Sequence, residues 1–208
     1  MNNQFKSQVE EYFSYYLEEL QEAGYISEWF YENNTFDLSD SISEPYLLQG
    51  KYKVLEKTEH LLHKASITAD FTIVWTDKAK NIFYLDREVP INCKVSEIPF
   101  RISWKAHQWP FPISYIEIKG SSEAKTSSSV SFPYKQKWLF WKEGIYIQKI
   151  KPFAPKKKSG ILFQSTFTPK KVIDIERYVR DCKYGRQGES KLKYDYKTLN
   201  QFIYNINN

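Results

Sequence analysis

The chain has 208 residues, enough for one domain with a core of its own and few for two. Hydrophobic residues make up 41% and charged residues 26%, which excludes a wholly disordered chain. No stretch approaches the roughly 18 apolar residues of a membrane span. The first twenty residues also lack the basic and then apolar pattern of a signal peptide. Cys93 and Cys182 are too few for a disulfide framework, so we expect a reducing, cytoplasmic location.

Charge is distributed unevenly along the chain. Residues 1–48 contain one Lys and ten Asp or Glu, whereas residues 149–208 contain 14 Lys or Arg and five Asp or Glu. The chain also contains 16 Tyr and 6 Trp. A basic face interleaved with aromatic residues favours nucleic acid over a membrane as partner. The alternative interpretation is a solvated, lysine-rich surface.

The first half of the sequence predicts one helix and one strand. Residues 5–23 carry a single apolar face at helical spacing, and Gly24 is typical of a helix end. Residues 25–60 give no clear pattern, and the segment SDSISEP (39–45) is typical of a loop. The segment ASITADFTIVW (65–75) alternates as a strand does. Its predicted apolar face consists of Ile67, Ala69, Phe71, Ile73 and Trp75.

The middle of the chain predicts an insertion, two strands and a helix. Residues 77–112 contain several prolines and are expected to form an insertion with a hairpin of its own. A second strand follows at 113–120, and a third at 145–150. Between them lie a low-complexity, mobile stretch at 121–131 and a helix at 133–144, running from Pro133 to Gly144.

The last quarter of the chain predicts a basic loop at 151–160 and a strand at 161–167. Helices are expected from Thr168 to about residue 180 and near 195–206. No internal repeat is present. The complete order predicts a single α/β domain over 1–208, with a mixed central β-sheet flanked by helices.

The sharpest chemical feature is the segment YIEIKG. Glu117 and Lys119 are two residues apart on a strand, so both side chains leave the same face. The acid Asp70 interrupts the apolar strand TADF on its less apolar face, where an unpaired charge is costly to bury. Two carboxylates from neighbouring strands repel each other unless a cation lies between them, and oxygen ligands of this kind suit Mg²⁺ or Mn²⁺. The alternative for Glu117 and Lys119 is an exposed ion pair.

On the first helix, Glu10 is the acid best placed to reach a cleft beside the sheet. Its position borders the apolar stripe, whereas Glu11 and Glu18 lie nearly opposite that stripe. For Glu11, Glu18, Glu19 and Glu22 the expected role is an ordinary solvated helix face.

The order of these motifs resembles the PD-(D/E)XK nuclease superfamily. The matching features are a helix with Glu10, TADF, YIEIKG and then YKQKWLF on a helix. Within the superfamily the sequence is most similar to small phage endonucleases and Holliday-junction-resolvase-like proteins. Their first helix carries a Ser-x-x-Glu pattern before a Leu-rich stretch and a Gly, which corresponds here to Ser7, Glu10 and Gly24. The resemblance covers about residues 5–150.

This resemblance implies a restriction-endonuclease-like αβββαβ core over about 5–150, with a basic C-terminal extension over about 151–208. It makes Asp70 and Glu117 ligands of Mg²⁺ or Mn²⁺, and Glu10 an auxiliary ligand of the metal or its water. Lys119 would activate or position the attacking water. The resemblance also counts Lys137, on the following helix, among the catalytic residues, as a contact to phosphate. Residues implied to contact nucleic acid are Lys137 or, as second choice, Lys135, and Lys151, Lys156, Lys157 and Lys158 in the basic loop.

Two departures from the family pattern affect these expectations. Ala69 occupies the position of the Pro that names the motif, a common exchange in the superfamily. The long gap between Asp70 and Glu117 requires the insertion at 77–112, which leaves the shape of the substrate open.

The expected function is therefore that of a metal-dependent DNA endonuclease that acts on branched DNA in recombination, in the host cytoplasm if a phage encodes it. Because symmetric cleavage of a junction requires two sites, a homodimer is expected. One alternative is a catalytically silent DNA-binding or assembly protein on a nuclease fold. Another is a transposase- or restriction-type endonuclease subunit that acts within a complex.

Other candidate sites are weaker. His60 and His63 form an HxxH pattern without a third soft ligand nearby, so no zinc site is expected. The sequence contains no Walker or Rossmann glycine pattern, which argues against a nucleotide-driven enzyme. Four tryptophans are candidates for stacking on unpaired bases, although most aromatic residues belong to cores. They are Trp104, Trp109, Trp138 and Trp141.

Overall fold

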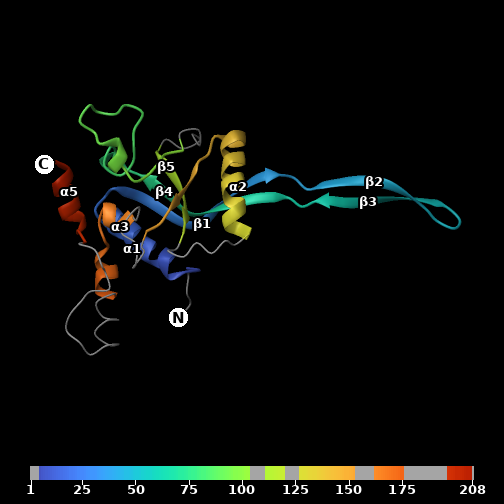
Figure 1. The fold of residues 1–208 in the computed structure, drawn as a ribbon, viewed down its shortest axis with the longest axis horizontal. Helices are drawn as coiled ribbons and strands as arrows, with labels where there is room; N and C mark the ends of the chain where they lie inside the picture. The colour runs from blue at the N-terminus through green and yellow to red at the C-terminus, as the bar shows by residue number, and fades with distance from the viewer. Residues whose placement is uncertain (1–4, 104–110, 120–126, 153–161, 176–195, 208) are drawn as a thin grey trace.

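The computed structural model describes residues 5–103, 111–119, 127–152, 162–175 and 196–207. They form a mixed α/β fold with a four-stranded sheet, a separate two-stranded sheet and helices (Figure 1). The helices are α1 (Gln8–Glu22), α2 (Ser127–Glu143), α3 (Leu162–Ser165) and α5 (Leu199–Asn207). The strands are β1 (Ile26–Ser39), β2 (Ile42–Gln49), β3 (Val54–Leu62), β4 (Ala65–Trp75), β5 (Ile113–Ile118) and β6 (Ile147–Ile150).

The four-stranded sheet has the order β1-β4-β5-β6. Strand β4 pairs antiparallel with β1 and with β5, and β5 pairs parallel with β6. The sheet is therefore mixed, as the sequence predicts. The strands expected at 65–75, 113–120 and 145–150 are confirmed as β4, β5 and β6.

Helix α1 confirms the predicted amphipathic helix, with its first residue at Gln8. The Ser7 hydroxyl accepts the backbone N–H of Glu10, which caps the helix, and Gly24 follows with a φ of +76° that disfavours other residues. The apolar face of α1 is buried against one side of the sheet and consists of Tyr12, Phe13, Tyr16, Leu17 and Leu20.

Helix α2 covers the other side of the sheet. Phe132 and Leu139 are buried there against Val74 of β4 and against Ile113 and Tyr115 of β5. The helix begins at Ser127, six residues before the predicted start, so that Pro133 lies inside it. Its end is as predicted, because Gly144 has a φ of +70° and donates its N–H to the carbonyl of Phe140.

The five apolar residues of β4 are all buried, but they divide between the two cores. Ile67 and Ala69 belong to the α2 side, whereas Phe71, Ile73 and Trp75 belong to the α1 side. The single apolar face predicted for this strand is therefore wrong. The division coincides with a bulge in β1 between Tyr31 and Asn34, opposite Asp70, and bulges increase the local twist of a strand.

The predicted loop at 39–45 and the predicted hairpin in the insertion are also wrong. A hairpin does form, but from β2 and β3, and it projects from the body of the molecule as a ribbon (Figure 1). The described part of the insertion contains two 3₁₀ turns, Asp77–Ala79 and Val95–Glu97, and its isolated bridges, Lys80 with Tyr84 and Tyr84 with Phe100, are parallel and form no hairpin. Phe83 and Phe100 from this segment are fully buried against Trp75 in the α1 core.

The C-terminal part adds short helices to the α1 side. The strand predicted at 161–167 is instead the short helix α3, because a brief apolar run fits either structure until its packing is known. Residues 170–175 are helical, and the predicted continuation to about 180 lies outside the described residues. Helix α5 confirms the last predicted helix, with Leu199 and Phe202 buried. None of the described helices is both long and apolar enough to cross a membrane.

Candidate active site

The pairing of β4 with β5 brings the predicted acids together. Phe71 is opposite Ile116 in the antiparallel ladder, so the next position places Asp70 opposite Glu117. Opposite residues of an antiparallel pair project from the same face of the sheet. The sequence-predicted carboxylates from two separate strands therefore meet on the α2 side of the sheet.

The ladder ends at this point, and Asp70 compensates for the missing backbone partner. The N–H of Ile118 donates to Asp70 Oδ2 at 2.7 Å, where a continued strand would offer a carbonyl. A half-buried carboxylate thus satisfies a buried backbone donor. Since one carboxylate oxygen is fixed in this way, the orientation of the whole Asp70 side chain is fixed as well.

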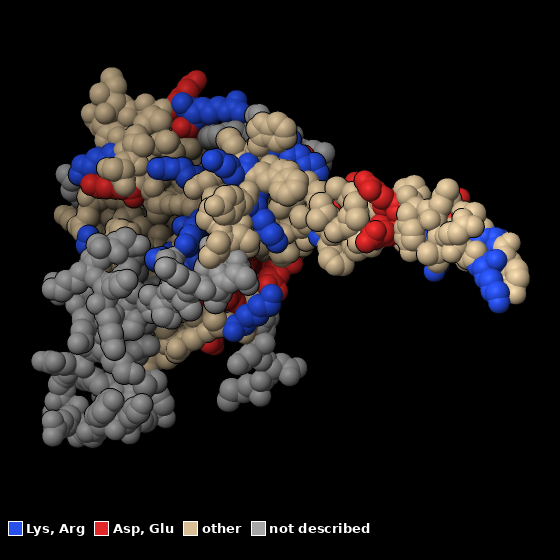
Figure 2. Space-filling view, turned by 45° about the vertical axis from the view of Figure 1, so that its right-hand side comes forward, with Lys and Arg blue, Asp and Glu red and all other residues tan. Residues whose placement is uncertain are grey.

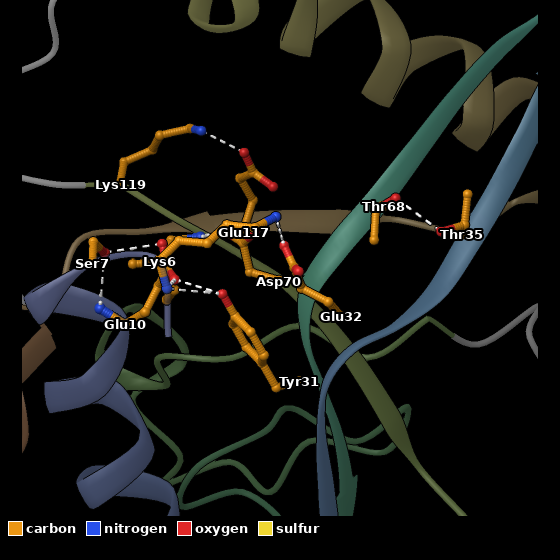
Figure 3. A network of polar contacts seen from close by, with 11 residues as sticks. Lys6, Ser7, Glu10, Tyr31, Glu32, Thr35, Thr68, Asp70, Glu117 and Lys119 are labelled. Carbon is orange, nitrogen blue, oxygen red and sulfur yellow. Dashed lines mark hydrogen bonds and ion pairs between the residues drawn. The ribbon is translucent and has the colours of Figure 1, made fainter. Parts of the chain in front are cut away.

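Lys119 joins the two acids, as its spacing from Glu117 predicts. Its ammonium group forms an ion pair with Glu117 Oε1 and lies over the ring of Phe132 at 5.6 Å from the centroid (Figure 3). The Lys119 and Glu117 side chains are only 20% and 14% exposed. The alternative of an ordinary exposed ion pair does not describe these two residues.

The carboxylate of Asp70 is in an unfavourable electrostatic position. Burial is the largest cause, followed by the negative charge of Glu117, and together they raise the pKa of Asp70 to about 7. The Ile118 N–H and the charge of Lys119 act in the opposite direction, and Glu10 adds a smaller upward effect. A carboxylate that repels its neighbour and titrates near neutrality is typical of functional sites and of cation sites.

Glu10 lies at the start of α1 and has a structural role there. Its Oε1 accepts the hydroxyl of Ser7 at 2.9 Å, and its Oε2 accepts the backbone N–H of Lys6 at 3.0 Å. The Ser7 hydroxyl in turn accepts the Glu10 N–H, so these bonds cap the helix in the manner of a capping box, with the N–H of Lys6 in place of that of Ser7. The Ser-x-x-Glu pattern therefore has a role at the helix start. Glu10 acts on Asp70 through its charge, and its carboxylate oxygens are engaged at the helix end.

Two neighbours of the site were not predicted from the sequence. The hydroxyl of Tyr31 donates to Glu10 Oε2 at 2.8 Å, and burial together with this bond raises the pKa of Tyr31 above its ordinary value. Lys6 forms an ion pair with Glu32, which has a φ of +46° in the bulge of β1 (Figure 3). The signal was hidden because residues 25–60 give no strand pattern, so nothing indicated that Tyr31 lies beside β4.

The lysines predicted on α2 lie on different faces of the helix. Lys135 donates to the backbone carbonyl of Ser66 at 2.9 Å, at about 60° from Phe132 at 100° per residue. Lys137 is exposed at about 140° from Phe132 and lines a cavity of 610 Å³ with Tyr134, Phe140 and Tyr146. Lys135 is therefore on the side of α2 that faces the sheet, and Lys137 is on the outer side, away from the sheet and its acids.

Two further predicted features are placed only in part. Of the predicted basic segment, Lys151 is partly buried next to β6 and makes a polar or electrostatic contact. Lys156, Lys157 and Lys158 lie outside the described residues, as do Trp104 and Trp109. Trp138 and Trp141 are exposed on α2.

The described residues contain no group of three or more His, Cys, Asp or Glu side chains arranged to hold a metal ion. His60 and His63, at the end of β3, form only a pair, with 2.8 Å between His60 Nε2 and His63 Nδ1. Asp70 and Glu117 likewise form a pair. A cation at this pair would take its other ligands from water or from a substrate.

No family model, curated protein or solved structure matches this chain. The geometry of the site and the resemblance of its motifs are the two sources for a functional interpretation.

Proposed function

We propose that this protein is a metal-dependent DNA endonuclease with a restriction-endonuclease-like core. One observation carries the proposal: the carboxylates of Asp70 and Glu117 and the ammonium of Lys119 converge where β4 and β5 part. The three residue types are the D, E and K of the motif that the sequence resembles. Their proximity follows from the sheet, since 46 residues separate Asp70 from Glu117.

The donor set fits a hard divalent cation. Two adjacent carboxylates, one with a pKa raised to about 7, are stabilised by a positive charge between them. Mg²⁺ is commonly held by one or two carboxylates, with waters and phosphate oxygens as its remaining ligands. Asp70 and Glu117 would hold the ion, which would supply a more acidic water and charge for the phosphate oxygens.

The residues of the chain would then divide the work of phosphodiester hydrolysis. The Ile118 N–H keeps the Asp70 carboxylate in one orientation, and the Glu117 carboxylate does the same for the Lys119 ammonium. Lys119 is thereby placed to stabilise negative charge that develops on the phosphate during attack. The Lys119 side chain is largely buried and its ammonium group lies over the Phe132 ring, and such partial burial strengthens its interaction with an anion.

The outer surface of α2, which faces away from the acids, supports binding of nucleic acid at a distance from the cleaved bond. Tyr134, Trp138 and Trp141 are exposed on the helix together with Lys137, and Trp141 is 86% exposed. Exposed aromatic rings next to lysines suit the stacking of unpaired bases and the binding of their phosphates. A preference for branched DNA, in the manner of a junction resolvase, is consistent with such a surface and with the basic segment at 151–158.

The test is cleavage of linear, nicked, flapped and four-way DNAs with Mg²⁺, with Mn²⁺ or with EDTA. We expect metal-dependent cleavage that Asp70→Asn and Glu117→Gln each abolish. Asp37→Asn and Glu143→Gln are matched controls, because both remove exposed carboxylates in surface ion pairs, and both should cut normally.

The outcomes also separate the rival functions. Binding of DNA without metal dependence and without any nick would indicate a DNA-binding or assembly protein. Cleavage only after a partner protein is added would indicate a subunit of a transposase- or restriction-type complex. A rate near wild type in either site variant would eliminate the proposed metal site.

A further inference from the structure

The ribbon formed by β2 and β3 exposes an unusual amount of apolar surface. Every residue of β2 is exposed, and in β3 all residues except the half-buried Leu55 are exposed. A lone two-stranded ribbon is at best marginally stable in water, and its outer edges leave backbone groups for another strand. The exposed large hydrophobic residues of the ribbon are Ile42, Tyr46, Leu47, Leu48, Tyr52, Val54, Leu61 and Leu62.

The charges of the ribbon balance, which argues against nucleic acid on this surface. From residue 42 to residue 62 the chain contains three lysines and three glutamates. Affinity for a duplex depends mainly on excess positive charge against phosphates, and the ribbon offers none. Apolar surface without net charge favours a protein partner.

Four of these six charges are nevertheless separated along the ribbon, whereas Glu56 and Lys57 are neighbours at its middle. Lys51 and Lys53 lie in the turn between β2 and β3, whereas Glu44 and Glu59 are directly opposite each other nearer the base of the ladder. Figure 2 shows positive charge at the tip of the ribbon and a band of negative charge closer to the body. Like charges in directly opposite positions are destabilising. Among the described residues neither glutamate forms an ion pair. The acidic band thus favours a positive partner. Between that band and the basic tip lie the exposed apolar residues Tyr46, Leu47, Leu48 and Val54, together with Glu56 and Lys57, whereas Ile42, Leu61 and Leu62 lie on the other side of the band.

The ribbon thus carries acidic residues toward its base, apolar residues at its centre and basic residues at its tip. Two such ribbons that lie antiparallel place the acidic part of each against the basic tip of the other. If two ribbons lie antiparallel about a twofold axis between Leu47 and Leu48, Glu44 of each copy faces Lys51 of the other. Glu59, opposite Glu44, approaches the same lysine. We propose that the ribbon is a dimerisation arm that packs antiparallel against the arm of a second copy of this chain. The proposal rests on the arm alone and is independent of nuclease activity.

The first test is the mass of the full-length protein in solution, measured by sedimentation velocity over a range of concentrations. We expect a dimer for the wild type and a monomer for the double variant Leu47→Asp, Leu48→Asp. Because both residues are exposed, circular dichroism should show an unchanged fold. Ile91→Asp is the matched control, since Ile91 is an exposed aliphatic residue of the body, and this variant should remain dimeric. The proposal would be overturned if the wild type is a monomer, or if the double variant remains a dimer.

The second test identifies the partner as another copy in the antiparallel orientation. Glu44→Lys alone and Lys51→Glu alone each set like charges against each other at two symmetric contacts. Each should raise the dissociation constant about tenfold, the scale expected for two exposed ion pairs. A mixture of the two variants should form a heterodimer of wild-type affinity, because both contacts become opposite in charge again. Failure of the mixture to recover affinity would refute the antiparallel alignment.

Discussion

Replacing Asp70 with Asn should make the protein more stable at neutral and alkaline pH, although the residue is proposed to be essential for activity. The native pKa of about 7 lies above the ordinary value of 3.8, because the carboxylate is buried and faces Glu117. Asn has nearly the same volume and its oxygen can still accept the Ile118 N–H. The substitution therefore removes the buried charge and keeps the hydrogen bond.

The sign and size of the effect follow from proton linkage. Below about pH 3 Asp70 is protonated in both states, so wild type and variant should be equally stable. Between about pH 4 and 7 the unfolded chain loses its proton and the native chain retains it, so wild-type stability falls as pH rises. Above about pH 7 the full difference remains. A shift from 3.8 to about 7 corresponds to at most about 4 kcal/mol.

The assay is chemical denaturation of both proteins from pH 4 to pH 8, without divalent cations. At pH 8 the free energy of unfolding of the variant should exceed that of the wild type by up to about 4 kcal/mol. In a thermal melt, each kcal/mol should raise the Tm by about 2–4 °C. Addition of Mg²⁺ should stabilise the wild type and narrow the gap, since a cation neutralises the same repulsion. Asp37→Asn, at an exposed ion pair, should show no comparable pH dependence. A variant that is less stable than the wild type at pH 8 would refute the electrostatic argument.

Three further predictions concern the site and the DNA contact. Lys119→Ala should lower the single-turnover rate about 10²–10³-fold and change DNA affinity much less. Lys119→Arg should recover little of the lost rate. If Lys119→Ala binds DNA weakly but cleaves it at a normal rate, Lys119 only anchors the DNA. Glu10→Gln should lower cleavage or change the metal preference, because it removes a negative charge that acts on Asp70, whereas Glu11→Gln should not. Equal behaviour of the two variants in a metal titration would remove Glu10 from the site. Changing residues 156–158 from Lys to Ala should weaken binding to all DNAs and reduce the log–log salt slope by roughly 0.9 for each lost contact; an unchanged slope would place the segment away from DNA.

The parts of the fold that the sequence could predict are those with a strong local signal. The capped amphipathic helix α1 and the apolar strands β4 and β5 fall in this class. The ribbon could not be predicted, because its residues are exposed on both faces and so show no alternation. For α3, a short apolar run without flanking signals gave the wrong element, and only its packing decides that it is helical.

The residues of the candidate site also differ in how far the sequence could predict them. Glu117 and Lys119 were predictable because two residues of one strand must share a face. Asp70 joins them through a strand pairing between distant parts of the sequence, which the resemblance to a family implied and local patterns could not. Tyr31 and Glu32 reach the site through a bulge in a strand that gave no pattern, so neither was predictable. Glu10 shows the limit of a motif, since Ser-x-x-Glu has a sufficient explanation in helix capping.

The two proposals together lead to a final prediction about the products of cleavage. A twofold dimer carries two copies of the pair Asp70 and Glu117, and the paired arms fix the distance between them. Such a dimer should cut a symmetric four-way junction twice within the lifetime of one complex. The Leu47→Asp, Leu48→Asp variant keeps each site intact but separates the copies, so it should nick one strand at a time. A supercoiled plasmid with an extruded cruciform distinguishes these products, because paired cuts give linear DNA directly and single cuts give a nicked circle first. If the arm variant still produces linear DNA without a nicked intermediate, the arms do not hold the two sites together.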